Sequence, residues 1–225
     1  MTNSGPYNPL DRGNLAVSVA EALLAKRPQQ LGGLKPFTGA GIYAIYYVGT
    51  FPAYKAISQR NKSGKFEAPI YVGKAIPKGA RKGVIDSSAT TTRALYSRLQ
   101  EHAESIQAVK SLDIKDFHCR YLVVDDIWIP LGESLLIAKF APIWNTVIDG
   151  FGNHDPGKGR YAGMRPRWDV LHSGRNWADK CVSRPENAGQ ISKEVEEFLR
   201  STPIPSNPRF YAEQPRVNYD LDGPN

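Results

Sequence analysis

Cysteine is scarce in this chain: Cys119 and Cys181 are the only two among 225 residues, and no C-x-x-C pair occurs. A disulfide framework and a cysteine-rich zinc ribbon are therefore excluded. The N-terminal residues lack the basic segment followed by an apolar segment that marks a secretory signal peptide. No apolar run approaches the ~18 residues that a membrane-spanning helix needs. We therefore expect a soluble cytoplasmic protein with no membrane partner.

Acidic residues are also in the minority, with 22 Asp and Glu against 29 Lys and Arg, a net charge of +7 and a pI near 9.4. Residues 51–82 hold eight basic side chains and one acidic one, so the rest of the chain is neutral. A second basic stretch covers residues 150–185. Both stretches have the composition of loops. Positive loops on a neutral scaffold favour a nucleic-acid partner, although either stretch alone could be an ordinary basic surface.

Hydrophobic periodicity predicts an α+β fold, a small mainly antiparallel sheet flanked by helices. The segment between the first two strands, residues 50–68, is expected to be a long polar loop. The proline-rich residues 202–225 lack periodicity, so they either wrap the surface or are partly disordered. The predicted helices cover residues 14–26, 91–109, 132–140 and 190–200, and the predicted strands cover residues 41–48, 69–74 and 117–124.

Six residues with the chemistry of phosphodiester hydrolysis recur along these elements. Hydrolysis needs an activated water, neutralisation of the phosphoryl oxygens and help for the leaving oxygen. On a helical wheel, Arg98 borders the apolar stripe of its helix and His102 lies within it, so both point toward the sheet. A carboxylate on an apolar helix face, such as Glu133, needs a partner, and a divalent cation is a good one. The set is Tyr43 (in GIY), Tyr71 (in YVG), Arg98, His102, Glu133 and Asn145.

This ordered series resembles the GIY-YIG nuclease superfamily over roughly residues 40–146. The family usually places its two tripeptides close together, whereas 27 residues separate Tyr43 from Tyr71 here, and the insertion is basic. The resemblance implies a single nuclease domain over residues 1–225. Its parts are a helical extension at 1–39, a catalytic core at 40–146, and a DNA-contacting, wrapping extension at 147–225. The helix at 14–26 is then either a core helix or part of a dimer interface.

The resemblance also implies roles for these residues. Tyr43 is the general base, with Lys74 and His102 as the alternatives. A free tyrosine has a pKa of ~10, so Tyr43 needs help from a nearby cation, the metal-bound water or His102. Tyr71 orients the water or holds the phosphate, and Arg98 neutralises the phosphoryl oxygens. Glu133 holds one Mg²⁺ that waters and phosphate oxygens complete. In addition, Lys74 supplies a further phosphate contact, and Asn145 positions the glutamate side of the site or a metal-bound water.

Each of these residues also has a structural interpretation. Tyr43 and Tyr71 could be half-buried strand tyrosines. His102 could be a hydrogen-bonded core histidine, and Glu133 could be a first-turn acid favoured by the helix dipole. In the same way, Asn145 could form a turn and Lys74 could lie on the surface. If every residue had only its structural role, the whole set would match the order of the family by accident. This favours the catalytic interpretation.

Residues 150–178, GFGNHDPGKGRYAGMRPRWDVLHSGRNWA, resemble the type II restriction endonucleases that cut the palindrome CCGCGG (SacII specificity). Membership in that group implies a bacterial cytoplasmic enzyme, a homodimer or tetramer, and a cognate DNA methyltransferase as functional partner. A G·C-only target suits Arg and Lys, which read the guanine edge. We interpret His154 and Asp155 as structural loop residues. Candidate DNA contacts are Arg60, Lys62, Lys65, Lys74, Arg160, Arg165 and Arg167.

Two other functions fit the same residues. A repair or homing-type GIY-YIG nuclease would cut structured or lightly specific DNA. A DNA-binding module could keep the scaffold without activity, although the complete set of six residues argues against this. The positive charge alone does not distinguish DNA from RNA.

Overall fold

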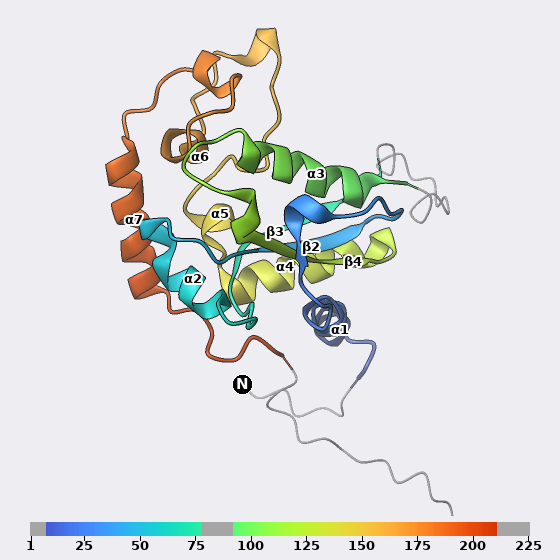
Figure 1. Cartoon of the computed structure of the whole chain (residues 1–225). Coiled ribbons are helices and arrows are strands. Elements are labelled where there is room, and N and C mark those ends of the chain that lie inside the picture. The colour runs from blue at the N-terminus through green and yellow to red at the C-terminus, as the bar shows by residue number, and fades with distance from the viewer. Residues whose placement is uncertain (1–7, 78–91, 211–225) are drawn as a thin grey trace, which may run out of the picture.

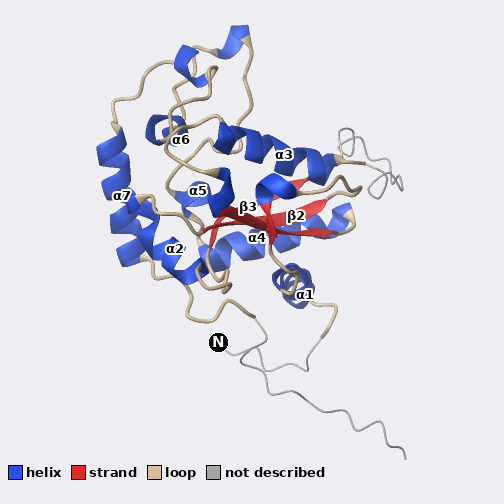
Figure 2. Ribbon diagram, in the orientation of Figure 1, coloured by secondary structure: helices blue, strands red, loops and turns tan. Residues whose placement is uncertain are grey.

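The computed structural model describes residues 8–77 and 92–210. Its centre is a four-stranded antiparallel sheet with the strand order β1–β4–β2–β3. Helices cover both faces of this sheet (Figure 2), which confirms the expected α+β class. The strands are β1 (Gln29–Gln30), β2 (Gly41–Tyr47), β3 (Pro69–Ala75) and β4 (Phe117–Val123).

Strand β2 is buried along its whole length because it lies between β4 and β3 and has helices on both sides. Successive side chains of a strand point to opposite faces, so β2 supplies two cores. Its Ile42, Ala44 and Tyr46 pack with helix α1 (Arg12–Leu24) and helix α4 (Ile129–Phe140). Its other three side chains, Tyr43, Ile45 and Tyr47, pack on the opposite face with helix α3 (Ala94–Gln107).

The face that carries α3 is the more heavily covered one. Four more helices contribute buried residues or polar contacts there, and α7 runs alongside α2 at the edge of the molecule (Figure 1). The irregular chain between α5 and α7 contains α6, so the second basic stretch is more ordered than a simple loop. The helices are α2 (Lys55–Asn61), α5 (Ile143–Thr146), α6 (Arg167–Leu171) and α7 (Ala188–Ser201).

Several helix boundaries differ from the sequence prediction, and two of the differences have a clear local reason. Helix α1 begins at Arg12 because the Asp11 carboxylate accepts a hydrogen bond from the Gly13 main-chain N–H. Helix α4 begins at Ile129, three residues earlier than expected, with Pro130 in its first turn. A first-turn proline has no intrahelical hydrogen bond to lose. Glu133 therefore lies in the second turn and is not the first-turn acid of the structural interpretation.

The prediction of a polar loop at residues 50–68 is wrong. The chain forms a 3₁₀ turn at Pro52–Tyr54 that continues into α2. Ala53, Tyr54 and Ile57 are buried against the α3-side core, while the lysines of the segment point outward. The apolar residues recur at helical spacing, but the basic residues in and after this stretch hid the amphipathic pattern.

Asn61, the last residue of α2, ties the end of this insertion to the sheet. Its buried side-chain amide donates to Tyr47 O (3.0 Å) and Ala68 O (2.8 Å) and accepts from Ala68 N (2.9 Å). Each hydrogen bond contributes ~1 kcal/mol net. We expect Asn61→Ala to lower the free energy of unfolding in urea by about 3 kcal/mol.

The matched control is Asn14→Ala, which removes one exposed hydrogen bond to Asn8 O. It is expected to change the free energy of unfolding by less than about 0.5 kcal/mol. A loss below about 1 kcal/mol for Asn61→Ala would contradict the bracing role.

The described part of the C-terminal tail, residues 202–210, runs over α2, α4 and α1. Arg60 of α2 donates to Pro205 O (2.8 Å), and Lys139 of α4 donates to Arg209 O (2.9 Å). The buried Glu21 of α1 pairs with Arg209. Residues 211–225, the remainder of the predicted wrapping tail, lie outside the described residues, as do Lys78, Arg81 and Lys82 of the first basic stretch.

Helix α1 packs against α4 and β4 as a core helix, with Ala20, Leu23 and Leu24 buried. It is 13 residues long. Within residues 8–77 and 92–210, the helices are too short or too polar for any of them to cross a membrane.

Candidate active site

Tyr43 and His102 form a buried pair between β2 and α3. The Tyr43 hydroxyl lies 2.6 Å from His102 Nε2, and each residue is only 1% exposed. Burial lowers the pKa of His102 well below its usual value, and the Arg98 charge adds to this effect. Burial also raises the pKa of Tyr43 well above its usual value. At neutral pH the pair is therefore a neutral phenol hydrogen-bonded to a neutral imidazole.

Tyr71 lies on the same face of the sheet as Tyr43. The strand register places Tyr43 opposite Gly73 and Ile45 opposite Tyr71. The two tyrosine rings are 6.2 Å apart. The Tyr43 ring crosses β3 directly over Gly73, since a Cβ atom there would lie 2.5 Å from the Tyr43 oxygen. The glycine of the YVG tripeptide is thus required for the two tyrosines to share this face.

Arg98 brings a fixed positive charge next to both tyrosines. Its Nη2 donates to Gly152 O (2.6 Å), and its Nη1 donates to Glu101 Oε2 (3.0 Å) and to His154 Nε2 (2.5 Å). Burial raises the pKa of Tyr71, and the Arg98 charge opposes that rise. The guanidinium is therefore held on one side by these three acceptors and faces the tyrosine hydroxyls with its other side.

Glu133 reaches the site from the opposite face of the sheet, around the edge strand β3. Lys74 points to that face, and its Nζ lies 2.6 Å from Glu133 Oε2. The Glu133 side chain is only 16% exposed. Burial raises the pKa of Tyr71 and the Arg98 charge lowers it, and the negative charge of Glu133 adds a smaller upward shift. The carboxylate is thus electrostatically coupled to the tyrosine pair, and an ammonium group neutralises it.

Asn145, from the short helix α5, braces strand β3. Its side chain accepts from Val72 N (2.8 Å) and donates to Val72 O (2.8 Å). Val72 stands between Tyr71 and the strand glycine. Asn145 therefore holds the strand that carries the second tyrosine.

The residues present fit a single hard cation. Among the residues that the structure describes, there is no group of three or more His, Cys, Asp or Glu side chains that could hold a metal. Magnesium is commonly bound by one or two carboxylates, with waters and substrate phosphates completing its shell. Glu133, partly buried and already paired with the Lys74 cation, suits that arrangement.

The candidate DNA contacts divide into two groups. Lys62, Lys65 and Arg160 are exposed, and Lys74 belongs to the site itself. The three remaining arginines are partly buried and make ion pairs within the chain. These pairs are Arg60 with Glu67, Arg165 with Asp179, and Arg167 with Glu194.

The irregular segment at residues 150–154 joins the site, although none of its residues was predicted to have a catalytic role. The Phe151 ring stacks on His102 with 4.5 Å between centroids and 15° between planes. Gly152 and His154 accept hydrogen bonds from Arg98, so the loop interpretation of His154 missed a contact. No periodicity marks this segment because it is neither helix nor strand.

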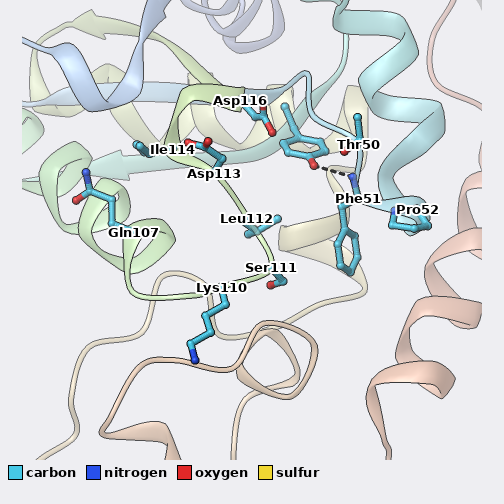
Figure 3. Close-up of a pocket in the computed structure, with 11 residues that line it drawn as sticks. Thr50, Phe51, Pro52, Gln107, Lys110, Ser111, Leu112, Asp113, Ile114 and Asp116 are labelled. Atoms are coloured by element: carbon cyan, nitrogen blue, oxygen red, sulfur yellow. Dashed lines mark hydrogen bonds between the residues drawn. The ribbon is translucent and has the colours of Figure 1, made fainter.

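A separate hollow of about 630 Å³ lies at the far end of β2, around Tyr47 (Figure 3). Its walls come from the chain after β2, including Phe51, and from the chain after α3, including Ser111 and Asp113. It includes none of the six candidate residues, so this hollow is not the proposed reaction site.

Because two histidines are buried in their neutral form, we expect acid to destabilise the fold. His172 is fully buried, and burial lowers its pKa to about 3; the pKa of His102 is lowered as well. In the unfolded chain both titrate near 6.5, so below that pH the unfolded state binds more protons. Stability therefore falls as pH falls, by ~1.4 kcal/mol per pH unit for each histidine.

Urea unfolding at pH 7.5 and at pH 5.5 measures this effect. The free energy of unfolding is expected to be about 3 kcal/mol lower at pH 5.5. Most carboxylates titrate below this window. A stability that is unchanged or higher at pH 5.5 would mean that these histidines are protonated in the folded protein.

Comparison with known families agrees with this geometry. A family model described as the Eco29kI GIY-YIG domain matches residues 35–199. The match contains all six candidate residues and extends through the irregular segment that contacts Arg98. No curated protein matches the chain.

Proposed function

The chain belongs to the Eco29kI GIY-YIG domain family of restriction endonucleases, and from this premise we propose that it is a type II enzyme. Membership makes the chain a DNA nuclease. The proposal is Mg²⁺-dependent hydrolysis of double-stranded DNA at a specific palindrome. The observation that carries it is the buried Tyr43–His102 pair, which faces the Arg98 guanidinium.

The proton of the attacking water leaves through Tyr43. A phenol whose pKa is raised cannot act as a base while it keeps its own proton. The Tyr43 oxygen accepts the water proton while its own proton passes to Nε2 of the neutral His102, 2.6 Å away. The transfer places a positive charge on His102, which burial disfavours. The negative charge of the bound phosphate would offset this cost.

Charge on the phosphoryl group is neutralised by residues around it. The side of Arg98 that faces the tyrosines offers its remaining N–H groups to the phosphoryl oxygens. Lys74 adds a second cation at the edge of β3. Glu133 would hold the Mg²⁺, which as a Lewis acid stabilises the charge of the transition state. If Glu133 held the ion, the Lys74 ammonium would be free to contact phosphate.

Specificity for CCGCGG rests on the resemblance of residues 150–178 to enzymes that cut this palindrome. Lys62, Lys65 and Arg160 are exposed, which supports a role for them in contacts with guanine edges or phosphates. A palindrome cut on both strands, with one active site per chain, calls for a two-fold homodimer. A cognate methyltransferase would protect the same site in the host.

Two plasmids that differ only in one CCGCGG site test this proposal. With Mg²⁺, the purified protein is expected to linearise the plasmid that carries the site and to leave the other intact. EDTA is expected to abolish the cut. The state of assembly is measured by analytical ultracentrifugation with the specific duplex, where two chains per duplex are expected.

The other outcomes separate the alternatives. Discrete cuts at another sequence would keep the restriction enzyme and refute the target. A smear, or nicking of both plasmids, would indicate a repair or homing-type nuclease. Intact DNA with a salt-sensitive mobility shift would indicate a binding module without catalysis.

A further inference from the structure

The contacts of Arg98 come from a segment that has no regular structure of its own. Gly152 O and His154 Nε2 both accept hydrogen bonds from the guanidinium, at 2.6 and 2.5 Å. Gly152 lies so close that a Cβ atom there would be 2.9 Å from both Arg98 Nη2 and the Tyr71 hydroxyl. The orientation of Arg98 therefore depends on what fixes residues 150–154.

Arg175 fixes this segment from behind. Its Nη2 donates to Gly150 O (2.9 Å), and its Nη1 donates to Phe151 O (3.1 Å) and Asn153 O (3.1 Å). One side chain thus binds the carbonyl groups of three of the five residues in the segment. The carbonyl between them, that of Gly152, is the one that points to Arg98.

Arg175 is itself rigidly held. It is 5% exposed and forms a two-pronged ion pair with Asp169 of α6, with Nε–Oδ1 at 2.6 Å and Nη2–Oδ2 at 2.5 Å. Its guanidinium lies over the rings of Trp168 (4.6 Å) and Trp177 (4.8 Å). Nothing in this cluster contacts the tyrosine pair directly.

We propose that Arg175 and Asp169 are positioning residues for catalysis, which fix the Arg98 guanidinium through the main chain of residues 150–154. This inference rests on the proposed DNA hydrolysis and deepens it. A buried ion pair costs desolvation and is weak support for stability. Its use here is geometric, because only a planar fork with five N–H donors can satisfy a carboxylate and three carbonyl groups together.

The test is the conservative variant Arg175→Lys, which keeps the positive charge beside Asp169 and loses the fork. A displacement of Arg98 by about 1 Å is expected to lower kcat by about 10²-fold. The Kd for the duplex, measured in EDTA, is expected to change less than about threefold, because exposed lysines supply most of the non-specific affinity. In an Arg98→Ala background, Arg175→Lys should lower kcat no further, since both changes act through one group.

Arg120→Lys is the matched control. Arg120 also donates to two carbonyl groups, Lys26 O (2.8 Å) and Phe66 O (2.7 Å), and lies over the Tyr46 ring (4.9 Å). It contacts no residue of the site, so this variant is expected to lower the Tm without changing kcat. If Arg175→Lys does not fold, Asp169→Asn replaces it, because the amide keeps the size of the carboxylate but weakens its hold on Nε and Nη2 of Arg175.

A second readout needs no activity. Hindered rotation of a held guanidinium gives resolved Nη–H signals in ¹⁵N NMR, and those of Arg98 are expected in the wild type and in Arg120→Lys but not in Arg175→Lys. Unchanged Arg98 signals in Arg175→Lys, or a kcat that falls by the same factor with and without Arg98, would overturn the inference. A wild type that cleaves no DNA would overturn the proposed function, and the NMR comparison would still decide the positioning.

Discussion

Replacing Glu133 with glutamine is expected to slow DNA cleavage by at least about 10³-fold, which corresponds to ~4 kcal/mol of lost transition-state stabilisation. The amide keeps the size of the side chain but cannot hold Mg²⁺ as a carboxylate does. It also loses the ion pair that now places Lys74 at 2.6 Å. The rate is measured under single-turnover conditions with saturating Mg²⁺, and DNA affinity is measured separately in EDTA.

Affinity is expected to be retained or slightly increased, because the change removes a negative charge next to the phosphate. Glu197→Gln is the control, since it makes the same change on exposed α7, where Glu197 faces Lys193. Cleavage by Glu133→Gln at the wild-type rate would show that Glu133 is not part of the active site.

Tyr43→Phe is expected to lower the cleavage rate by about 10²–10⁴-fold, the usual contribution of a positioned acid or base. Only the hydroxyl is lost, so the ring still packs over Gly73. The proton then has no path from the attacking water to His102, whose Nε2 is 2.6 Å from that hydroxyl. Single-turnover rates from pH 6 to pH 9 test this, and added base in the buffer should not restore the rate because the pair is buried.

The chain contains a matched control for this change. Tyr54 is also buried, its hydroxyl lies 2.6 Å from Nε2 of the buried His172, and it accepts a hydrogen bond from Trp144 Nε1. Tyr54→Phe is expected to cost about 1–3 kcal/mol of stability and to leave the rate of folded enzyme unchanged. Equal losses of rate in Tyr43→Phe and Tyr54→Phe would show that the Tyr43–His102 pair has a structural role and no catalytic one.

The central sheet was predictable because its strands carry strong local signals. Six of the eight residues at 41–48 are β-branched or aromatic, and the structure forms β2 there. Helices with a one-sided apolar stripe, such as α3 and α7, were also predicted to within a few residues. In these elements, local propensity and burial favour the same structure.

Elements whose signal is masked by charge or supplied by distant partners were not predictable. Helix α2 was hidden by its two basic residues, Lys55 and Arg60, the second of which binds Glu67 and the carbonyl of Pro205. The two residues of β1 pair only with β4 and have no pattern of their own.

The site was predictable in its members more than in its contacts. Tyr43, Tyr71, Arg98 and His102 come together as their places on β2, β3 and α3 imply. Their catalytic roles stay predictions. Periodicity could not reveal the contacts of Arg98 with Gly152 or those of Arg175 with the 150–154 segment. These contacts involve irregular chain and residues far apart in the sequence.

The most direct measurement is single-turnover cleavage of a duplex that contains CCGCGG, with the purified wild-type protein, first in EDTA and then after Mg²⁺ is added back. No cleavage is expected in EDTA, and one defined cut in each strand is expected once Mg²⁺ is present. Cleavage at the same rate in EDTA would contradict the role of Glu133. A duplex that is bound but stays intact in Mg²⁺ would contradict the assignment of this site as catalytic.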